Sequence, residues 1–583
     1  MNLPGQKDKF SPELRILVAS LLSMGVILIW AKYFGPKPPV SSPQTNRPAV
    51  SAPATPGPAT SSTTNTTQAP NTASAMAPAA NVPPKSDSQE RTIVIENDLY
   101  RVEISNRGAV VKSWQLKKYM DDAKPPHVLD VVHPAASLQT GGWPFAVVLD
   151  DEQLQNAANT GLYQISSGAE TLQAPADAEF AWSDGHLEIT KHFRFDHTYV
   201  VRVETTAKLD GRPITAGLGW LGGFGDLTVT NPVPVDTVST FYSENGKITN
   251  FPHKKLEGPD KWGAGAWQGG KDFVGIEDRY FAAAFLPASV GTPGTLETRY
   301  WKTSRTVQAN GQDTLEPVPQ VAVATSAQPL ALRVYVGPKD YDDLKKMNPP
   351  LHGLINFGWL EFVAEPMFHG LKWLHNYIPN WGWAVVVLTL IVNALFFPLR
   401  NSSYKTTLKM QRVAPEIKAI QERYKKYTMR DPRKAEMNKE VMAIYSREGI
   451  NPVGSCLPML LQMPVWFGLN TALRGAIEMR HAHWLWITDL SSRDPYYILP
   501  VLMGLSMYLV SKMTPVTATD PQQQAMAKFM PLSMAGMFVI FPFSSGLAAY
   551  ILTSNVVSIV QQWYLNRTHP APARVKQVRG KKS

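Results

Sequence analysis

The apolar residues of this chain follow two different patterns. In one part they alternate with polar residues over short runs, as Tyr100, Val102 and Ile104 do. The same period of two returns at 193–195, and Gly, Pro, Asn and Asp fill the gaps between runs. Such alternation is typical of half-buried β-strands. It predicts an antiparallel β domain, a sandwich, over 91–350.

Long apolar stretches with few charges mark the second half of the chain. A helix of roughly 20 apolar residues is long enough to cross a bilayer. Five such stretches make up a predicted α-helical membrane core over 381–566, at 383–400, 453–473, 496–513, 525–541 and 547–565.

An earlier apolar stretch, 14–34, follows a short polar N-terminus, 1–13. It is longer than the apolar stretch of a signal peptide, and no clear small-residue cleavage site comes after it. We expect an uncleaved anchor, with a cleaved signal peptide as the alternative. The pattern thus predicts six membrane-spanning helices in addition to the β domain.

Three connecting segments have compositions of their own. Residues 35–90 are rich in Pro, Ser, Thr and Ala, which do not bury a core, so we expect a disordered linker. Residues 351–380 mix aromatic and charged side chains and suit an amphipathic helix at the membrane interface. Residues 401–451 predict a charged helical hairpin, either a recruiting element or a solvated one without a partner.

The charge distribution predicts how these segments face the membrane. The chain carries a net charge of +10, although residues 91–350 hold 25 basic and 31 acidic residues. The positive excess lies elsewhere, with 13 Lys and Arg within 400–447 and six in the tail 567–583, which has no acidic residue. Positive residues stay on the cytoplasmic side. We expect the hairpin and both termini in the cytoplasm and the β domain outside.

Polar residues inside the predicted spans are the candidate functional residues. Thr389 and Asn393 are four residues apart and Arg400 is seven further on, so all three share one helix face. Gln462 lies in the next span, between two prolines. Uncompensated polarity is costly in hydrocarbon. These residues therefore indicate either a water-filled groove, which we favour, or hydrogen bonds that hold neighbouring helices together.

Several signals of enzymes and metal sites fail on inspection. The GxGxxG pattern at 217–222 is followed by a strand-like sequence and not by a helix, so it predicts a glycine-rich turn and no nucleotide site. The single cysteine, Cys456, excludes an intrachain disulfide and a cysteine metal cluster. His481 and His483 lie near two tryptophans at a predicted membrane edge, where we expect interfacial packing and no metal.

Several stretches of the second half resemble the YidC/Oxa/Alb family of membrane protein insertases, in the form found in Gram-negative bacteria. They cover most of 350–566. They are NWGW at 380–383, NPVGSCLPMLLQMP at 451–464, DPYYILP at 494–500, TDPQQQ at 519–524, and SG at 545–546 leading to SN at 554–555. The layout of one anchor, a periplasmic domain and five core helices also matches. Over 91–340 the resemblance lies in the architecture, a β-supersandwich.

This resemblance implies a membrane protein insertase and chaperone of the bacterial inner membrane, and not an enzyme. A hydrophilic groove, open to the cytoplasm and to lipid, receives a nascent hydrophobic segment and releases it into the bilayer. The implied partners are nascent membrane proteins, the ribosome, the Sec translocon with its accessory subunits, and membrane lipids. No cofactor, nucleotide or small-molecule substrate is implied.

The resemblance also implies three groups of site residues. The groove is expected to be lined by Thr389, Asn393, Arg400, Gln462, Met463, Trp466 and Tyr550. The hairpin is expected to recruit substrate through Arg412, Lys418, Arg423, Lys425 and Lys426. The tail is expected to engage ribosomes through Arg574, Lys576, Arg579, Lys581 and Lys582.

One position departs from the family pattern. Bacterial members usually carry an arginine inside the groove, and alignment of 391–398 places Asn393 there. Either Arg400, two turns away on the same face, reaches up from the cytoplasmic mouth, or Asn393 and Gln462 keep the groove wet with neutral groups alone.

Two other classes of protein stay open at this point. A secondary transporter usually has a site near the midplane and internal repeats, but no acidic residue lies deep in any predicted span and no repeat is visible. A membrane-anchored periplasmic protein that binds or processes sugars is the second class. It would use the β domain, where acidic residues are plentiful.

Overall fold

The computed structural model describes residues 83–570 except 227, 229–237, 253–266, 290–293, 310–311, 326–328, 428–430, 452–456 and most of 515–542. Some predictions fall outside the described residues, namely the anchor 14–34, nearly all of the linker 35–90, most of the span 525–541 and the tail beyond residue 570.

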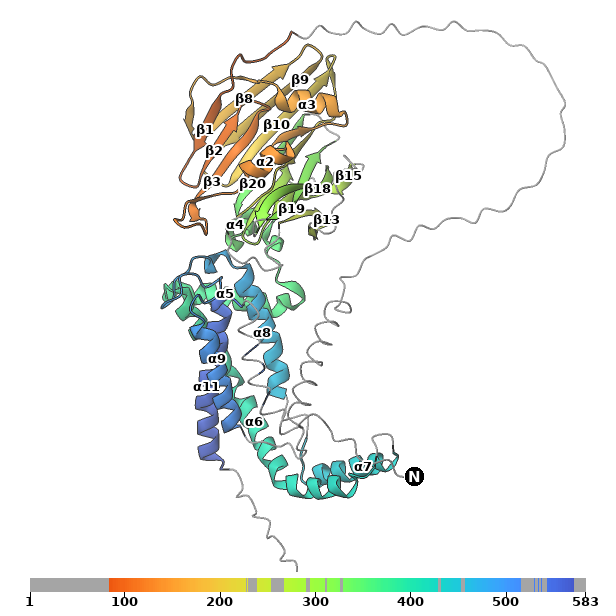
Figure 1. Cartoon of the computed structure of the whole chain (residues 1–583), viewed down its shortest axis with the longest axis vertical. Coiled ribbons are helices and arrows are strands. Elements are labelled where there is room, and N and C mark those ends of the chain that lie inside the picture. Colours follow the sequence, from red (N-terminus) through yellow and green to blue (C-terminus); the bar gives the residue numbers. More distant parts are fainter. Residues whose placement is uncertain are drawn as a thin grey trace, which may run out of the picture. The chain divides into compact units, whose positions relative to one another are not determined.

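The first part of the described chain consists of three β-sheets (Figure 1). The first has the order β4 (Val128–Asp130), β3 (Val110–Met120), β2 (Tyr100–Ser105), β1 (Thr92–Glu96) and β7 (Thr171–Gln173). The second has the order β14 (Lys247–Pro252), β13 (Ser239–Glu244), β16 (Phe273–Glu277), β17 (Phe281–Pro287), β20 (Leu330–Pro338), β10 (Val200–Leu209), β9 (Leu187–Phe195), β8 (Ala176–Ser183) and β6 (Gln164–Ile165), with β11 (Arg212–Pro213) beside β10. The third has the order β15 (Gln268–Lys271), β18 (Leu296–Ala309), β19 (Gln312–Ala324), β12 (Gly217–Trp220) and β5 (Ala146–Val148). Three short helices accompany them, α2 (Pro134–Thr140), α3 (Glu152–Thr160) and α4 (Tyr341–Lys346).

Alternation along the sequence explains these strands. In β9 every second residue is buried, and β9 pairs antiparallel with β10 so that Phe193 lies opposite Val203. Buried side chains therefore come from one face of the pair. The glycine-rich stretch that matched a nucleotide motif forms β12, a buried strand. The β-sandwich prediction is confirmed in its main feature, although the domain has three sheets.

The core of this region is built around Phe145, which is fully buried. Its ring lies 6.3 Å from that of Trp114 on β3, 5.5 Å from Phe193 on β9 and 6.0 Å from Trp220 on β12, measured between centroids. One residue from each sheet thus meets at a single aromatic cluster. Large aromatic groups contribute much of the apolar area that such a core removes from water.

A lysine is also fully buried in this core. Lys191 occupies an inward position of β9, and its Nζ donates to the carbonyl oxygens of Gly108 (2.7 Å), Ala109 (3.1 Å) and Phe145 (2.8 Å). All three acceptor residues have positive φ angles. Their backbone therefore turns in a way that few non-glycine residues adopt, and the ammonium group satisfies the carbonyls exposed by that turn.

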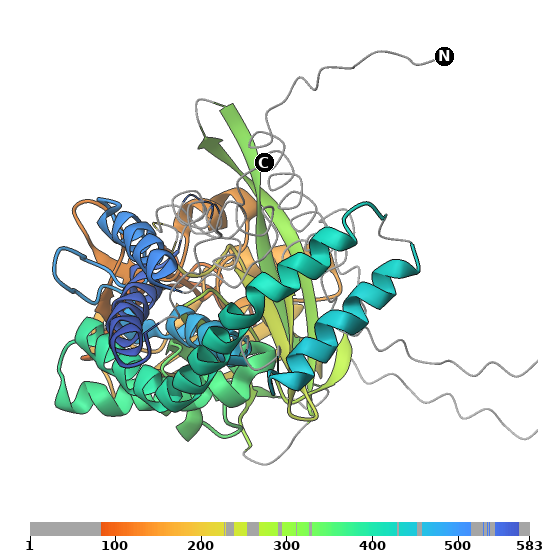
Figure 2. The same cartoon turned by 90° about the horizontal axis from the view of Figure 1, so that it is seen from below.

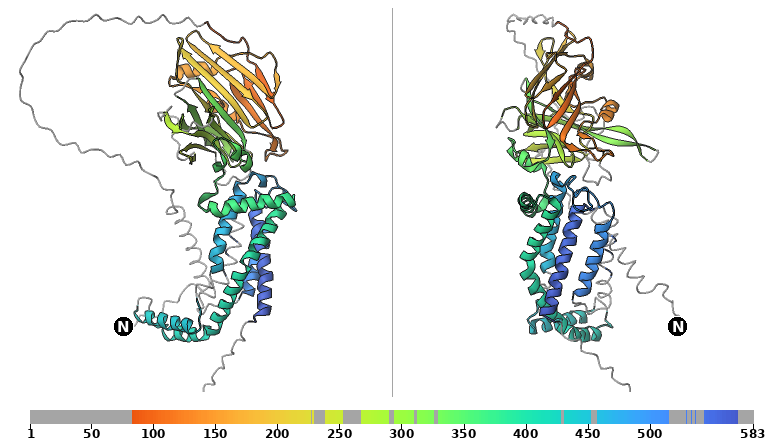
Figure 3. Two further views of the ribbon diagram at one scale, coloured as in Figure 1. Left: turned by 180° about the vertical axis from the view of Figure 1, so that it is seen from behind. Right: turned by 90° about the vertical axis from the view of Figure 1, so that its left-hand side faces the viewer.

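Helices form the second part of the described chain. They are α5 (Glu361–Tyr377), α6 (Trp381–Arg423), α7 (Arg433–Arg447), α8 (Leu457–Gly475), α9 (Ile498–Met513) and α11 (Ser545–Thr568), with short 3-10 turns η3 (His352–Leu354), η4 (Gly358–Leu360) and η6 (Ile477–Met479). Helix α11 packs against both α6 and α9, and the two views of Figure 3 show the three side by side. Helix α5 packs against α8 and α6.

The predicted amphipathic segment contains α5, whose two faces differ as expected. Ala364, Phe368 and Leu371 are buried, whereas Phe362 and Trp373 are exposed. Exposed aromatic side chains on one face of a helix suit the interfacial region of a membrane.

Helix α6 joins two elements that the sequence pattern separated. The predicted span 383–400 and the first arm of the predicted hairpin form one continuous helix that begins after the N-cap Asn380 and contains Pro398. By length and composition alone, α6 is the one helix among the described residues that is long and apolar enough to cross a membrane, and α9 is a shorter apolar helix. The far end of α6 lies alongside α7, as Figure 2 shows from below.

Candidate functional site: a polar seam between helices

Helix α11 carries a row of polar side chains along one face. Tyr550, Ser554, Ser558 and Gln561 follow one another at intervals of four, four and three residues. Residues with this spacing lie on one face of an α-helix. From Tyr550 to Gln561 the row extends about 16 Å along the axis at the usual rise per residue. It would therefore cover about half of a hydrocarbon core roughly 30 Å thick.

Helix α6 meets this row with two of the predicted residues. The Ser554 hydroxyl donates to Asn393 Oδ1 at 3.4 Å, and Gln561 Nε2 donates to the Asn393 carbonyl at 3.3 Å. Two turns further along α6, Arg400 Nη1 donates to Ser558 Oγ at 2.7 Å and to Gln561 Oε1 at 3.1 Å. Gln561 thus links Asn393 to Arg400, so the arginine is connected to the position that the family pattern gives to an arginine.

Helix α8 meets the same row from another side. Gln462 Nε2 donates to the Tyr550 hydroxyl at 2.7 Å, and Tyr550 is almost fully buried. Tyr550 and Ser554 lie on successive turns of α11, so Gln462 and Asn393 reach neighbouring positions of one row. We call this set the polar seam, defined by Asn393, Arg400, Gln462, Tyr550, Ser554, Ser558 and Gln561.

The other predicted groove residues lie near the seam but contribute less to it. Thr389 is fully buried and its hydroxyl donates to the Val385 carbonyl of its own helix at 2.7 Å. Asn393 Nδ2 donates to the Thr389 carbonyl at 2.8 Å. On α8, Met463 is exposed. Trp466 is half-buried, and its ring makes an edge-to-face contact with the ring of Phe467.

A second polar row on α11 faces α9. Asn555 Nδ2 donates to Ser506 Oγ at 3.0 Å, and Asn566 Nδ2 donates to the Met513 carbonyl at 3.1 Å. The Tyr404 hydroxyl donates to Asn566 Oδ1 at 2.7 Å. These contacts hold helices together without touching the seam, and they supply matched controls for it.

Sequence reasoning missed Ser558 in the seam and the pair of Tyr404 with Asn566 beyond it. The signal for Ser558 was present, because it continues the four-residue interval from Tyr550 and Ser554. The pairing of Arg400 with this row depends on the register between α6 and α11, which spacing within one helix does not give.

Comparison with known proteins decides the family. The family described as 60Kd inner membrane protein matches residues 373–572, which include the seam, and the YidC periplasmic domain matches residues 92–370. A membrane protein insertase YidC of Syntrophus aciditrophicus is 31% identical over 95% of this chain and 99% of its own length. A membrane protein insertase YidC of Burkholderia multivorans is 32% identical over 87% of this chain and 89% of its own length. The chain belongs to the YidC family of membrane protein insertases.

Among solved structures, an active YidC insertase with its first transmembrane domain resolved is similar at 16% sequence identity. The likeness covers 83% of this chain and 95% of that chain, with a TM-score of 0.34. The comparisons support the insertase interpretation of the sequence, and not the transporter or the sugar-binding protein.

The hairpin of this YidC family member exposes all five of its predicted recruiting residues. Its two arms, the end of α6 and α7, pack through a small apolar cluster that includes Val413, Ile417 and Ile444. The predicted residues lie outside that cluster and are Arg412, Lys418, Arg423, Lys425 and Lys426. Arg423 Nη2 lies 2.7 Å from Glu440 Oε2 of the other arm, so it also ties the hairpin together. The predicted tail residues, from Arg574 onward, lie outside the described part of the chain.

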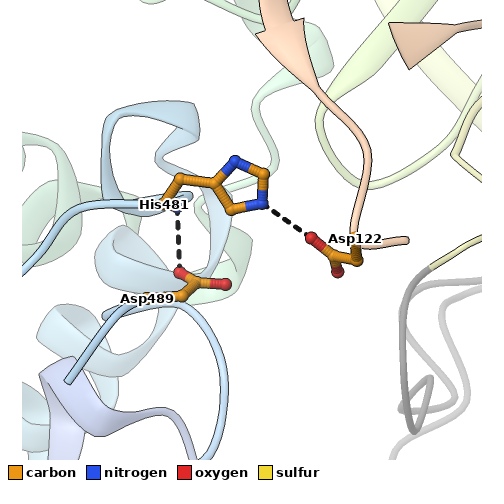
Figure 4. A group of neighbouring side chains, drawn as sticks. All are labelled: Asp122, His481 and Asp489. Carbon is orange, nitrogen blue, oxygen red and sulfur yellow. Dashed lines mark hydrogen bonds and ion pairs between the residues drawn. The ribbon is translucent and has the colours of Figure 1, made fainter. Parts of the chain in front are cut away.

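The segment after α8 contacts the β region through charged groups, where we had expected packing at a membrane edge. The buried Arg480 pairs with Asp226, and His481 Nε2 lies 2.7 Å from Asp122 Oδ1 (Figure 4). Burial opposes ionisation of Asp122, but the hydrogen bond with His481 and the charge of Arg480 hold its pKa below the usual value.

This junction also brings together three side chains with spacing suited to a metal ion. Asp122, His481 and Asp489 place one potential ligand atom each within 4.8 Å of one another. Arg480 Nη2 lies 3.7 Å from Asp122, so a cation bound there would face a neighbouring positive charge. Asp489 Oδ1 also accepts the backbone amides of His481 and Ser491. These contacts favour an ion-paired junction between the loop and the β region.

Proposed function

We propose that this chain inserts newly made membrane proteins into the bacterial inner membrane, and that the polar seam lines the path they take. A nascent hydrophobic segment would enter beside α6, α8 and α11 and pass laterally into lipid. Its polar flank would cross the bilayer along the seam. The proposal needs no catalytic residue, nucleotide or cofactor.

The observation that carries this proposal is the length and continuity of the seam. A charged group at the centre of a bilayer costs about 2.5–3.5 kcal/mol on insertion scales. Hydrogen-bonding side chains over about half the hydrocarbon thickness would admit water and shorten the dry path. The partitioning of the apolar segment and the membrane potential, about 2.3 kcal/mol per charge per 100 mV, would drive the transfer.

Arg400 has a defined role in this proposal. It lies at the end of the seam that continues into the basic hairpin, and Ser558 and Gln561 hold its guanidinium. A cation at that end would attract acidic flanks toward the seam, while Asn393 would keep the middle of the path polar without a fixed charge. This arrangement would substitute for the single arginine that the family usually has in the groove.

The proposed topology follows the sequence pattern. We propose six membrane-spanning helices, with the hairpin, the tail and both termini in the cytoplasm and the β domain in the periplasm. The basic residues of the hairpin and the tail would engage substrate and ribosome. The Sec translocon and its accessory subunits would be partners for larger substrates, and lipid would receive the inserted helices.

Crosslinking to a stalled nascent chain tests the proposal. Photo-reactive residues at Asn393 and Gln462 should form adducts with the hydrophobic segment of a ribosome-bound membrane protein. A matched probe at Val556, which is exposed on α11 away from the seam, should form few. Equal adduct formation at Val556 would show that the chain meets substrate without using the seam.

A further inference from the structure

A cavity of about 320 Å³ lies within the β region, away from the seam. It is bounded by all three residues of β4, by the first residues of α2 and by Arg305 of β18. Its volume lies at the lower end of the range for ligand pockets. Nothing in the proposed insertion path requires it.

One wall of this cavity is an open sheet edge. β4 is the last strand of the first sheet and pairs with β3 alone. Directly after β4, the Val131 carbonyl accepts from Gly225 N, so the edge without a partner strand among the described residues is limited to β4 itself. Val131 N donates to the Trp114 carbonyl on the β3 side, and Asp130 lies opposite Gln115. Groups alternate along an antiparallel ladder, so the amide and carbonyl of Asp130 face away from β3.

The charged side chains that border the cavity already have partners. Arg305 pairs with Glu316 at 2.5 Å. The Asp130 carboxylate accepts from Ser113 Oγ at 2.6 Å and from two backbone amides. Asp226 pairs with Arg480. The cavity therefore offers a hydrogen-bonding edge and aliphatic walls, and it suits an uncharged extended backbone better than an ion.

The cavity also adjoins the helical part of the chain. Asp226 lines it and, through its pair with Arg480, contacts the segment that follows α8. In the proposed topology this segment lies on the periplasmic side, where a translocated flank emerges unfolded. An unfolded segment presents unpaired amides and carbonyls, which an edge strand binds by strand addition.

We propose that this cavity is a peptide site, in which a newly translocated stretch of substrate pairs transiently with β4 as an added strand. The inference rests on the proposed insertase function and gives the β region a part in it. Because β4 has only three residues, the contact is short, and the bound segment is free to move on.

Crosslinking in the full-length protein tests the site. A photo-reactive residue at Val128, half-exposed on β4, should form adducts with a stalled nascent chain whose polar flank has crossed the membrane. The control is Thr171 on β7, the opposite edge of the same sheet. We expect about tenfold more adduct at Val128, equivalent to about 1.4 kcal/mol of preference. Equal yields at the two edges would overturn the proposal.

Filling the cavity gives an independent readout. Ala135→Trp places a large side chain at an exposed position that lines the cavity, so the fold should persist. The matched control Leu138→Trp lies on the same helix, is 74% exposed and does not line the cavity. Only Ala135→Trp should lower the Val128 adduct. An unchanged adduct in Ala135→Trp would contradict the proposal.

Insertion of the same substrate, measured in parallel by protease protection, separates the two proposals. If insertion proceeds without a Val128 adduct, the peptide site is wrong and the insertase function stands. If the reconstituted protein inserts nothing, the proposed function itself fails.

Discussion

Replacing Asn393 and Gln462 together by leucine should slow insertion of a short substrate about tenfold, the effect of raising the barrier by about 1.4 kcal/mol. The two substitutions remove the side-chain contacts of Gln462 with Tyr550 and of Asn393 with Ser554. Leucine is favourable in hydrocarbon, so the helices should still fold and insert. Protease protection of the substrate's translocated flank, in vesicles that contain the purified variant, measures the rate.

Asn555→Leu is the matched control for that variant. Asn555 lies on the same helix as the seam and donates to Ser506, so its loss removes an interhelical hydrogen bond without touching the seam. Such bonds contribute about 0.6 kcal/mol on average in a membrane. If the seam residues only hold helices together, the double variant and the control should lose thermal stability in similar measure and insertion should follow stability. We expect insertion to fall in the double variant alone.

The reverse substitution sharpens the distinction. Asn393→Arg places a charge in the middle of the seam, next to Ser554 and two turns from Arg400. A seam that admits water would hydrate this charge, and the variant should fold and keep its insertion activity. A dry helix contact would have to bury it at a cost of several kcal/mol, and the variant would then misfold.

Lys191→Met should destabilise the β region by about 3–9 kcal/mol, because three buried carbonyls lose their donor and each unsatisfied group costs about 1–3 kcal/mol. Hydrogen–deuterium exchange of β9 and β10 in the full-length protein measures this loss. Lys208→Met on the neighbouring strand β10 is the control, since its partially exposed Nζ lies 3.7 Å from Glu188 and should contribute little. Equal exchange in the two variants would contradict the assigned role.

Lys191 should also make the free energy of unfolding of the β region depend on pH. Burial lowers the pKa of Lys191 to about 7, whereas an unfolded lysine keeps its proton to about pH 10. Between these values the folded state binds fewer protons than the unfolded state, so the free energy of unfolding rises with pH. From pH 7 to pH 9 the wild-type protein should gain roughly 1.4 kcal/mol per pH unit relative to Lys191→Met. A difference that stays constant with pH would show that this pKa is not lowered.

The parts that could be predicted from sequence are those set by local periodicity. Alternation around Phe193 gave the strands, and the intervals among Thr389, Asn393 and Arg400 placed them on one helix face. Lys191 shows the limit of this reasoning. Its position in β9 follows the alternation of buried residues, whereas its charge predicts a side chain exposed to solvent. Its acceptors come from distant residues with unusual φ angles, and local sequence does not show that they meet.

The same limit applies to the candidate site. The sequence identified Asn393, Arg400, Gln462 and Tyr550 but not which side chains of α11 meet which residues of α6 and α8, because these contacts depend on how three helices are aligned. It also separated the span from the hairpin at residue 400, although α6 continues to Arg423 through Pro398. The contacts of Arg480 and His481 with the β region were likewise beyond spacing arguments.

Labelling of single cysteines tests most directly whether the seam is wet. With Cys456 replaced by serine, cysteines at 389, 393 and 462 are introduced one at a time and treated with a membrane-impermeant maleimide in intact vesicles. We predict that the probe at 462, which is partly exposed, reacts at a rate close to that of a cysteine at Lys426 in the exposed hairpin. The probe at 393, which is 7% exposed, should react more slowly but measurably, and the fully buried 389 should react slowest. Leu395, exposed on the apolar side of α6, should stay unlabelled. If positions 393 and 462 are as unreactive as 395, the helices hold no aqueous path and the seam only joins them.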